Sequence, residues 1–290
     1  MDLGKLGVWY FLDGLSTEDS VRTVKKIESL GYGALWLPET VGKDPLTTSS
    51  LLLNVTTKLN LATGIVNIYN REPGVMLAAQ KTLAEQSQNR FVLGMGVSHK
   101  PLVEGVRGLE YGPPVKTMRD YLSKMEASPY AGITSAEKPT TLIAALGPKM
   151  LELAAEKTDG AHPYFTSPEH TELARKILGN DKKLCVEQKV MLEPNLPKAR
   201  DLARPTAKIY QGLPNYRNNW SRMGLSEDDI DSLSDRFMDT TFALGTQAQI
   251  EKRLQDHFDA GADHVCIQPI NPNGKMGDID WSCLEALSKA

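Results

Sequence analysis

Short apolar runs alternate with longer amphipathic stretches along this whole chain. The short runs have the length and composition of buried β-strands, and they cover residues 6–11, 34–37, 61–66, 91–97, 141–146, 160–165, 184–192 and 264–268. Between them apolar residues recur at helical spacing, which predicts helices over residues 46–58, 73–87, 115–127, 148–157, 168–178, 215–223 and 227–238. Two further helices are predicted to begin at the capping boxes Ser16–Asp19 and Thr246–Gln249 and to end before Gly31 and Gly261.

This order of elements predicts a fold of the α/β class. Eight strands separated by helices over 290 residues suit one (β/α)8 TIM-barrel domain, residues 1–290, with a helical insertion around residues 197–239. A doubly wound sheet is the alternative, because alternation alone does not show that the sheet closes. However, the loop after the first strand, Phe11–Leu15, has a single glycine and no GxGxxG motif. The barrel is therefore the preferred fold.

The composition is typical of a soluble globular protein, with 41% hydrophobic and 24% charged residues. The net charge of −3 and the lack of a basic run predict that neither nucleic acid nor a membrane surface is a partner. No long uncharged apolar run is present and the chain enters its first strand almost at once, so neither a membrane span nor a signal peptide is predicted. Three cysteines without CxxC spacing, including Cys185 and Cys266 inside strands, indicate buried thiols in a reducing cytoplasm.

Polar residues follow most of the predicted strands. Barrel enzymes keep their sites at the C-terminal ends of strands, so the candidates for chemistry are Glu39, Thr40, Asn67, Arg71, Ser98, His99, Gly147, Lys149, Thr166 and Ser167. This polar ring suits a polar aromatic cofactor. It does not suit a metal, because only His99 of the five histidines falls at a strand end. No GxSxG motif is present, and no Ser/His/Asp set can be assembled.

Several of these residues also have a structural interpretation. His99 is the best candidate for proton transfer, because an unperturbed histidine titrates near neutrality, although loop histidines often face solvent without a role. Glu39 either belongs to the site or caps the following loop. Arg71 is expected to clamp the barrel rim by pairing with a carboxylate. The glycines of Leu93–Gly96 are expected to let side chains pack inside the barrel.

Two consecutive loops each place a small or hydroxylated residue before a proline that opens a helix, at Gly147-Pro148 and at Thr166-Ser167-Pro168. Free N–H groups and the helix dipole make such helix starts favourable for anions. Ordinary N-capping explains each of them alone. Two in succession favour a phosphate bound between them.

The order and spacing of several short motifs resemble the bacterial luciferase-like monooxygenase superfamily over essentially the whole chain. These motifs are Gly31–Glu39, Ala62–Ile65, Arg71-x-Pro73, Thr82–Ser87 with Asn89–Phe91, Leu93–Gly96 and Ala260–Val265. Within that superfamily the chain looks most like the actinobacterial branch that uses the deazaflavin coenzyme F-420. This closer resemblance lies in Gly64–Tyr69, Gly96–His99, Leu146–Met150 and Leu213–Tyr216.

The resemblance implies a TIM barrel with the cofactor ring at the C-terminal ends of the strands. It implies a cis peptide at Gly64–Ile65 that supports the ring, and a cofactor phosphate near Gly147 and Thr166. The chain departs from relatives at Thr40, where they often have a histidine, and at Asn89, where they have a glycine. Glu169 stands after Pro168 where relatives can use a lysine, so either Lys149 compensates or the cofactor phosphate is bound weakly.

The sequence therefore predicts an oxidoreductase that transfers a hydride between coenzyme F-420 and a small organic substrate. His99, and secondly Glu39, would exchange the proton. The predicted cofactor-binding residues are Gly64, Ile65, Asn67, Ser98, Gly147, Pro148, Lys149, Thr166 and Ser167. An FMN-dependent monooxygenase and a deazaflavin-binding barrel without turnover are the alternatives. A homodimer is expected, and the insertion, with Tyr210, Tyr216, Trp220 and Phe237, would form a lid, a subunit contact or plain core.

Overall fold

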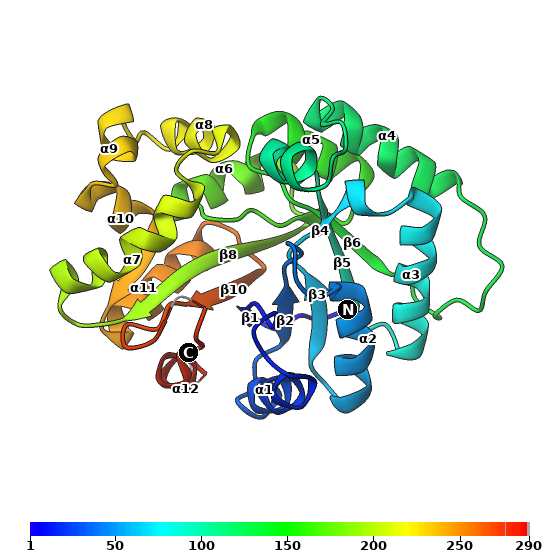
Figure 1. Cartoon of the computed structure of the whole chain (residues 1–290), viewed down its shortest axis with the longest axis horizontal. Helices are drawn as coiled ribbons and strands as arrows, with labels where there is room; N and C mark the ends of the chain where they lie inside the picture. Colours follow the sequence, from blue (N-terminus) through cyan, green and yellow to red (C-terminus); the bar gives the residue numbers. More distant parts are fainter. Residues whose placement is uncertain (276, 289–290) are drawn as a thin grey trace.

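Eight parallel strands close into a barrel in the computed structural model, which describes residues 1–275 and 277–288 (Figure 1). They are β1 (Leu6–Trp9), β2 (Ala34–Leu37), β3 (Asn60–Thr63), β5 (Phe91–Gly96), β6 (Thr140–Ile143), β7 (Gly160–Ala161), β8 (Lys183–Leu192) and β10 (His264–Pro269). The barrel closes because β10 pairs with both β8 and β1. The predicted TIM barrel is thus confirmed. A two-residue strand, β4 (Val66–Asn67), continues β3 and pairs with β5.

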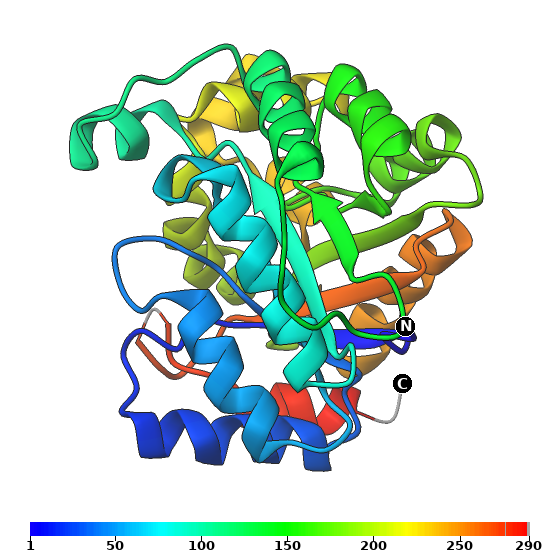
Figure 2. The ribbon, with the colours of Figure 1, turned by 90° about the vertical axis from the view of Figure 1, so that its right-hand side faces the viewer.

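Helices follow the strands and cover the outside of the barrel, as α1, α2 and α3 do in Figure 2. The helices with a place in the barrel are α1 (Thr17–Ser29), α2 (Pro45–Val55), α3 (Pro73–Gln86), α4 (Pro114–Ala127), α5 (Pro148–Lys157), α6 (Pro168–Leu178), α11 (Gln247–Asp259) and α12 (Trp281–Leu287). Many begin with proline, which lacks the N–H that a first helical turn cannot use. Two short helical turns, η1 (Ile68–Asn70) and the π-helical η2 (Pro101–Val106), follow β4 and β5.

The strands divide their side chains between two apolar cores, because successive residues of a strand point to opposite faces. Val8 and Leu35 pack between the barrel and its helices. Trp9 and Trp36, one position further along, fill the barrel interior together with Cys185 and other small residues. The interior is therefore a packed core, and a ligand can be held only at the mouth.

The segment between β8 and α11 forms an insertion with its own apolar cluster. It contains α7 (Leu196–Tyr210), α8 (Pro214–Arg222), α9 (Glu227–Ser232) and α10 (Asp235–Thr241), which gather on one side of the barrel in Figure 1. The prediction of one helix over residues 227–238 is wrong. The helix ends at Leu233, which adopts a left-handed conformation, and Ser234 then caps α10.

A further strand, β9 (Phe242–Gly245), was not predicted. It pairs with the residues Lys189–Leu192 of β8. β7 pairs with β8 only at Lys183 and Leu184, because Pro163 has no N–H with which to extend the ladder. β9 therefore pairs with the C-terminal part of the β8 edge that β7 leaves unpaired. No helix in the described part of the chain combines the length and apolar character needed to cross a bilayer.

Three histidines are held neutral in the interior. His264 Nδ1 donates to the Gly4 carbonyl, and its Nε2 accepts from the Trp36 indole. His162 stacks on Trp36, with 4.4 Å between ring centroids. His257 bridges β8 and α6 through hydrogen bonds at both ring nitrogens. Burial lowers the pKa of His162 and His264 to about 4 and that of His257 to about 3.

Candidate functional site

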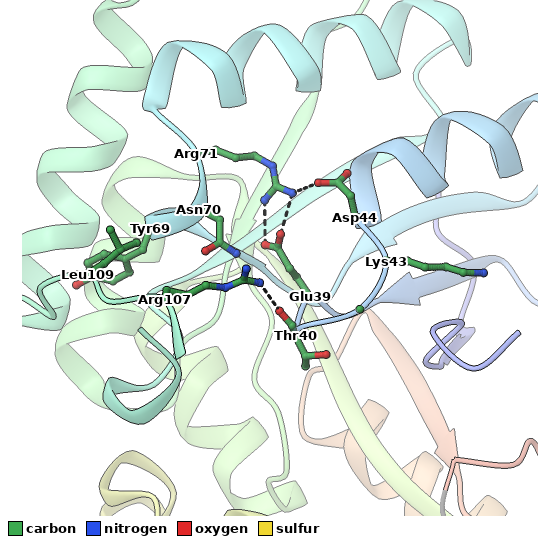
Figure 3. Close-up of a pocket in the computed structure, with 10 residues that line it drawn as sticks. Glu39, Thr40, Lys43, Asp44, Tyr69, Asn70, Arg71, Arg107 and Leu109 are labelled. Atoms are coloured by element: carbon green, nitrogen blue, oxygen red, sulfur yellow. Dashed lines mark hydrogen bonds and ion pairs between the residues drawn. The ribbon is translucent and has the colours of Figure 1, made fainter. Parts of the chain in front are cut away.

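The C-terminal ends of β2 and β4 bring Glu39, Asn67 and Arg71 together. Figure 3 shows the contact of Glu39 with Arg71. Glu39 Oε2 accepts from the Asn67 backbone N–H at 2.7 Å, and the Arg71 guanidinium bridges both carboxylate oxygens at 2.8 and 2.9 Å. Arg71 also pairs with Asp44. The expected clamp by Arg71 on the rim is therefore confirmed. Since three donors already engage its oxygens, Glu39 is better suited to orient the rim than to exchange a proton.

Asn67 is almost fully buried, and its side chain is partly committed to the local turn. Its Oδ1 accepts from the Tyr69 backbone N–H at 3.0 Å, which caps η1. The amide Nδ2 has only a long contact of 3.4 Å with Asn70 Oδ1. That weak contact leaves the Nδ2 donor as the part of Asn67 that is free to change partner.

His99 lies at the end of β5, between the barrel mouth and the insertion. Ser98 before it adopts a left-handed conformation, which turns the chain sharply after the strand. The His99 ring is half-buried and lies 5.6 Å from the ring of Tyr216 on α8. Burial lowers the pKa of His99, and a hydrogen bond with the Asn215 side chain opposes that shift. His99 is therefore neutral near pH 7 and able to accept a proton.

Between β3 and β4 the peptide bond Gly64–Ile65 is cis, as the family resemblance implies. The Gly64 carbonyl accepts from the Trp9 indole N–H at 2.8 Å, and the Ile65 carbonyl accepts from the Glu39 backbone N–H at 3.2 Å. Trp9 of β1 and Glu39 after β2 thus hold this bulge in place. Gly96 leaves room for the Ile65 side chain, because a Cβ at Gly96 would lie only 2.7 Å from Ile65 Cδ1.

Replacing Gly64 with alanine is expected to destabilise the fold by about 1–3 kcal/mol, the usual cost of overpacking. The new Cβ would lie 2.9 Å from His162 Nε2 and 2.9 Å from Trp9 Nε1, and both rings are buried and held by hydrogen bonds. Urea unfolding would measure the change. Gly212→Ala is the matched control, because a Cβ there meets nothing within 4 Å. Equal stabilities of the two variants would contradict this packing argument.

The loops after β6 and β7 form a second polar cluster. His170, in the first turn of α6, donates from Nε2 to the Leu146 carbonyl at 2.8 Å and so ties the two loops together. Thr166 is fully buried, and its hydroxyl has no hydrogen-bond partner among the described residues. The Nδ1 atom of His170 is likewise buried and unpartnered within that part of the chain. Such orphaned polar atoms need a partner from outside the protein.

Arg222 at the end of α8 supplies the positive charge that this cluster otherwise lacks. Its Nη2 lies 3.4 Å from the position that a Cβ on Gly147 would take. Burial alone lowers the pKa of Arg222, and no carboxylate pairs with it in the described part of the chain. Lys149 is exposed. Gly147, Thr166 and Arg222 therefore form a candidate anion site, in which Ser167 is committed to capping α6 and the neutral His170 ring, donating from Nε2, offers only an acceptor at Nδ1.

Sequence reasoning missed two charged residues inside the barrel. Glu187 and Lys189 are fully buried, and Lys189 Nζ lies 3.2 and 3.3 Å from the Glu187 carboxylate oxygens. Lys189 Nζ also lies 3.7 and 3.9 Å from the ring centroids of Tyr164 and Phe165. The available signal was the presence of both charges within an otherwise apolar strand. Arg222 gave no comparable signal, because its position depends on where the insertion folds.

No group of His, Cys, Asp or Glu side chains able to hold a metal occurs among the described residues. Comparisons with known proteins identify the family. Residues 5–264 match the family model of luciferase-like monooxygenases. The 5,10-methylenetetrahydromethanopterin reductase of Archaeoglobus fulgidus is 26% identical over 287 residues, which cover 88% of this chain and 85% of the relative.

Two further proteins are similar over most of the chain. A protein of Mycobacterium tuberculosis, provisionally named a coenzyme F-420-dependent oxidoreductase, is 25% identical over 255 residues, or 73% of each chain. The solved structure of an F-420-dependent secondary alcohol dehydrogenase with an F-420–acetone adduct has a TM-score of 0.75 at 14% identity. That match covers 100% of this chain and 98% of the other, so the fold is shared throughout.

Proposed function

Because the chain belongs to the luciferase-like monooxygenase family, we propose that it is an oxidoreductase that transfers a hydride between coenzyme F-420 and a small organic substrate at the barrel mouth. The observation that carries the proposal is the way α8 connects His99 with the polar cluster after β6 and β7. Its Tyr216 touches His99, and its Arg222 lies beside Gly147. Six residues of helix separate these contacts by about 9 Å, a distance that the linker between a deazaflavin ring and its phosphate can span.

The residues fit such a cofactor at both ends. The unpartnered hydroxyl of Thr166 and the guanidinium of Arg222, which pairs with no carboxylate of the described residues and donates only to Asn219 Oδ1 at 3.3 Å, suit the phosphate, with Gly147, Pro148, Lys149 and Ser167 at the two helix starts. Gly64 and Ile65 would support the ring, and Asn67 and Ser98 would meet its polar edge. When bound, the ring supplies the hydride chemistry. The Mycobacterium tuberculosis relative, named for dependence on coenzyme F-420, supports this choice of cofactor.

His99 is the residue proposed to exchange the proton that accompanies hydride transfer. It is neutral near pH 7 and half-buried beside Tyr216, where water is partly excluded. Glu39 is the second candidate, although its pairing with Arg71 makes a positioning role the better assignment. A single domain, a homodimer and a cytoplasmic location stay predictions. Light scattering of the purified protein would test the dimer.

Titration of the purified protein with coenzyme F-420 and with FMN, followed by fluorescence, tests the proposal. Coenzyme F-420 should bind at micromolar concentrations and FMN more weakly. Absence of deazaflavin binding in that range would reject the proposal. If FMN binds instead and its reduced form consumes oxygen, the FMN-dependent monooxygenase suggested by the family's description is the better assignment.

The charge on the phosphate site gives a sharper prediction. Arg222→Gln is expected to weaken coenzyme F-420 binding by about tenfold or more, because a charge-assisted hydrogen bond is lost. The Arg222→Gln variant and the wild type should have the same affinity for a deazariboflavin without the phosphate. Lys149→Gln is the matched comparison, since Lys149 is exposed at the start of α5. A larger loss in Lys149→Gln than in Arg222→Gln would contradict the assignment of Arg222.

Binding without turnover is the remaining alternative, and Thr40 in place of a histidine favours it. Variants His99→Ala and Glu39→Ala separate it from catalysis. Loss of activity in His99→Ala with unchanged coenzyme F-420 affinity would support a proton-exchange role. Binding of coenzyme F-420 without any turnover in the wild-type protein would favour a non-catalytic deazaflavin-binding barrel, and unchanged activity in both variants would remove His99 and Glu39 from the proton-exchange role.

A further inference from the structure

A second cleft opens at the barrel mouth, between α7 and the loop that follows β10. Its volume is about 600 Å³, within the range of pockets that hold a drug-sized ligand. We call it the α7 cleft and define it by Trp9, Phe11, Leu202, Ile209, Tyr210 and Gln268. None of these residues has a place in the proton-exchange or phosphate sites described above.

The walls of the α7 cleft are apolar although they face solvent. Leu202 and Ile209 lie two turns apart on α7 and are 38% and 56% exposed. The opposite face of the same helix packs its alanines into the apolar cluster of the insertion. α7 therefore has a buried apolar face and, separately, a pair of exposed aliphatic side chains that line the cleft. Exposed apolar surface of this kind marks binding sites.

The charges at the cleft favour a neutral ligand. Two carboxylates, Asp13 and Asp278, and one ammonium, Lys275, are its charged lining residues, so the local charge is negative and repels anions. The carboxylates accept backbone N–H groups of Lys43 and Lys275 at 2.7 and 2.8 Å and so are engaged within the protein. The cleft beside Glu39 differs, since its 470 Å³ is lined by charged side chains including Arg71 and Arg107.

The inner end of the α7 cleft provides one hydrogen-bond donor. Tyr164 donates its hydroxyl proton to Gln268 Oε1 at 2.9 Å, and Tyr210 in turn donates to Tyr164 at 2.7 Å. This arrangement leaves the Gln268 Nε2 group without an acceptor among the described residues. A ligand oxygen in the cleft can accept from it.

Trp9 connects the α7 cleft to the bulge at Gly64–Ile65. Trp9 is a lining residue of the cleft, and its indole donates to the Gly64 carbonyl at 2.8 Å. A residue of the cleft wall is therefore in direct contact with the bulge. This is the place that a substrate needs if a cofactor ring rests on the bulge.

We propose that the α7 cleft binds the substrate, and that the substrate is a neutral, mainly apolar molecule with one hydrogen-bond-accepting oxygen. Its apolar part lies against Phe11, Leu202 and Ile209, and its oxygen accepts from Gln268 Nε2. The role as substrate site rests on the proposed function, whereas the chemistry of the bound molecule rests on the cleft itself.

Binding of 2-acetonaphthone and of 2-naphthoate to the cofactor-free protein, measured by calorimetry, tests the chemistry. The two probes share one ring system and differ in charge. The neutral ketone should bind at least about tenfold more tightly than the anion. Ile209→Asp should weaken ketone binding by about tenfold or more, because it places a carboxylate in the apolar wall. Ile133→Asp, at a residue that is 78% exposed and lines neither cleft, should leave it unchanged.

Equal affinity for the two probes, or equal effects of the two aspartate variants, would overturn the proposal. Both variants alter exposed side chains, so folding is not at risk. Ketone binding to the protein loaded with coenzyme F-420 tests the role as substrate site, and the affinity should be retained. Displacement of one ligand by the other would show that the cleft is part of the cofactor site. Failure of coenzyme F-420 itself to bind would reject the proposed function and leave the chemistry of the cleft standing.

Discussion

Lys189→Met is expected to lower the free energy of unfolding by about 3–5 kcal/mol, the usual cost of leaving one partner of a buried ion pair uncompensated. Lys189 and Glu187 are both fully buried, with 3.2 Å between Nζ and Oε2. In the variant the Glu187 carboxylate keeps only the Phe165 backbone N–H, at 2.9 Å. Burial raises the pKa of Glu187, so protonation of the carboxyl would limit the loss. Urea unfolding followed by circular dichroism measures the change.

Two further variants separate the ion pair from simple packing. The double variant Glu187→Gln/Lys189→Met removes both charges and keeps an acceptor for Phe165, so it should recover most of the lost stability. Lys116→Met removes one partner of an exposed pair with Asp120 and should have little effect. A Lys189→Met protein as stable as the wild type would contradict the argument. Phe165 has a left-handed conformation directly before Thr166, so the pair also supports the loop of the anion site.

The barrel could be predicted because each of its strands can be recognised from the local sequence alone. Each strand is a short apolar run, and parallel strands converge at one edge, so residues after them can be expected to meet. Glu39, Asn67 and Arg71 meet in this way. Local patterns were insufficient where tertiary contacts decide. β9 exists because β7 stops after two residues and leaves an edge of β8 unpaired.

Local sequence patterns were likewise insufficient to predict the site residues that the insertion supplies. The positions of Tyr216 and Arg222 depend on how α8 packs over the barrel mouth, which no local spacing in the sequence determines. The sequence indicated that Arg71 pairs with a carboxylate, but only the fold shows that Glu39 and Asp44 provide it. Conversely, Glu187 and Lys189 were visible as charges within an apolar strand. Their alternation with Val186 and Val190 places them on the inner face of β8, opposite the residues of the outer core.

The three interior histidines make the fold sensitive to acid. His162, His264 and His257 have pKa values of about 4, 4 and 3 in the folded protein, against an ordinary value of 6.5. Between pH 6.5 and 4 the unfolded chain therefore binds protons that the folded chain does not. Because the unfolded state binds more protons, lowering the pH through this window favours unfolding. Their contribution to stability is complete above pH 6.5.

Lowering the pH from 7 to 5 is therefore expected to cost about 6 kcal/mol of unfolding free energy, since each histidine contributes about 1.4 kcal/mol per pH unit below 6.5. A loss of this size is comparable to the whole stability of many domains. Urea unfolding at a series of pH values measures the slope. His257→Gln should lower the number of protons taken up on unfolding by one, and so reduce the slope of stability against pH. The substitution removes one titrating ring, while an amide still faces Gln188 and Thr171. A stability that is constant between pH 7 and 5 would show that these rings are protonated in the folded state, and that burial does not hold them neutral.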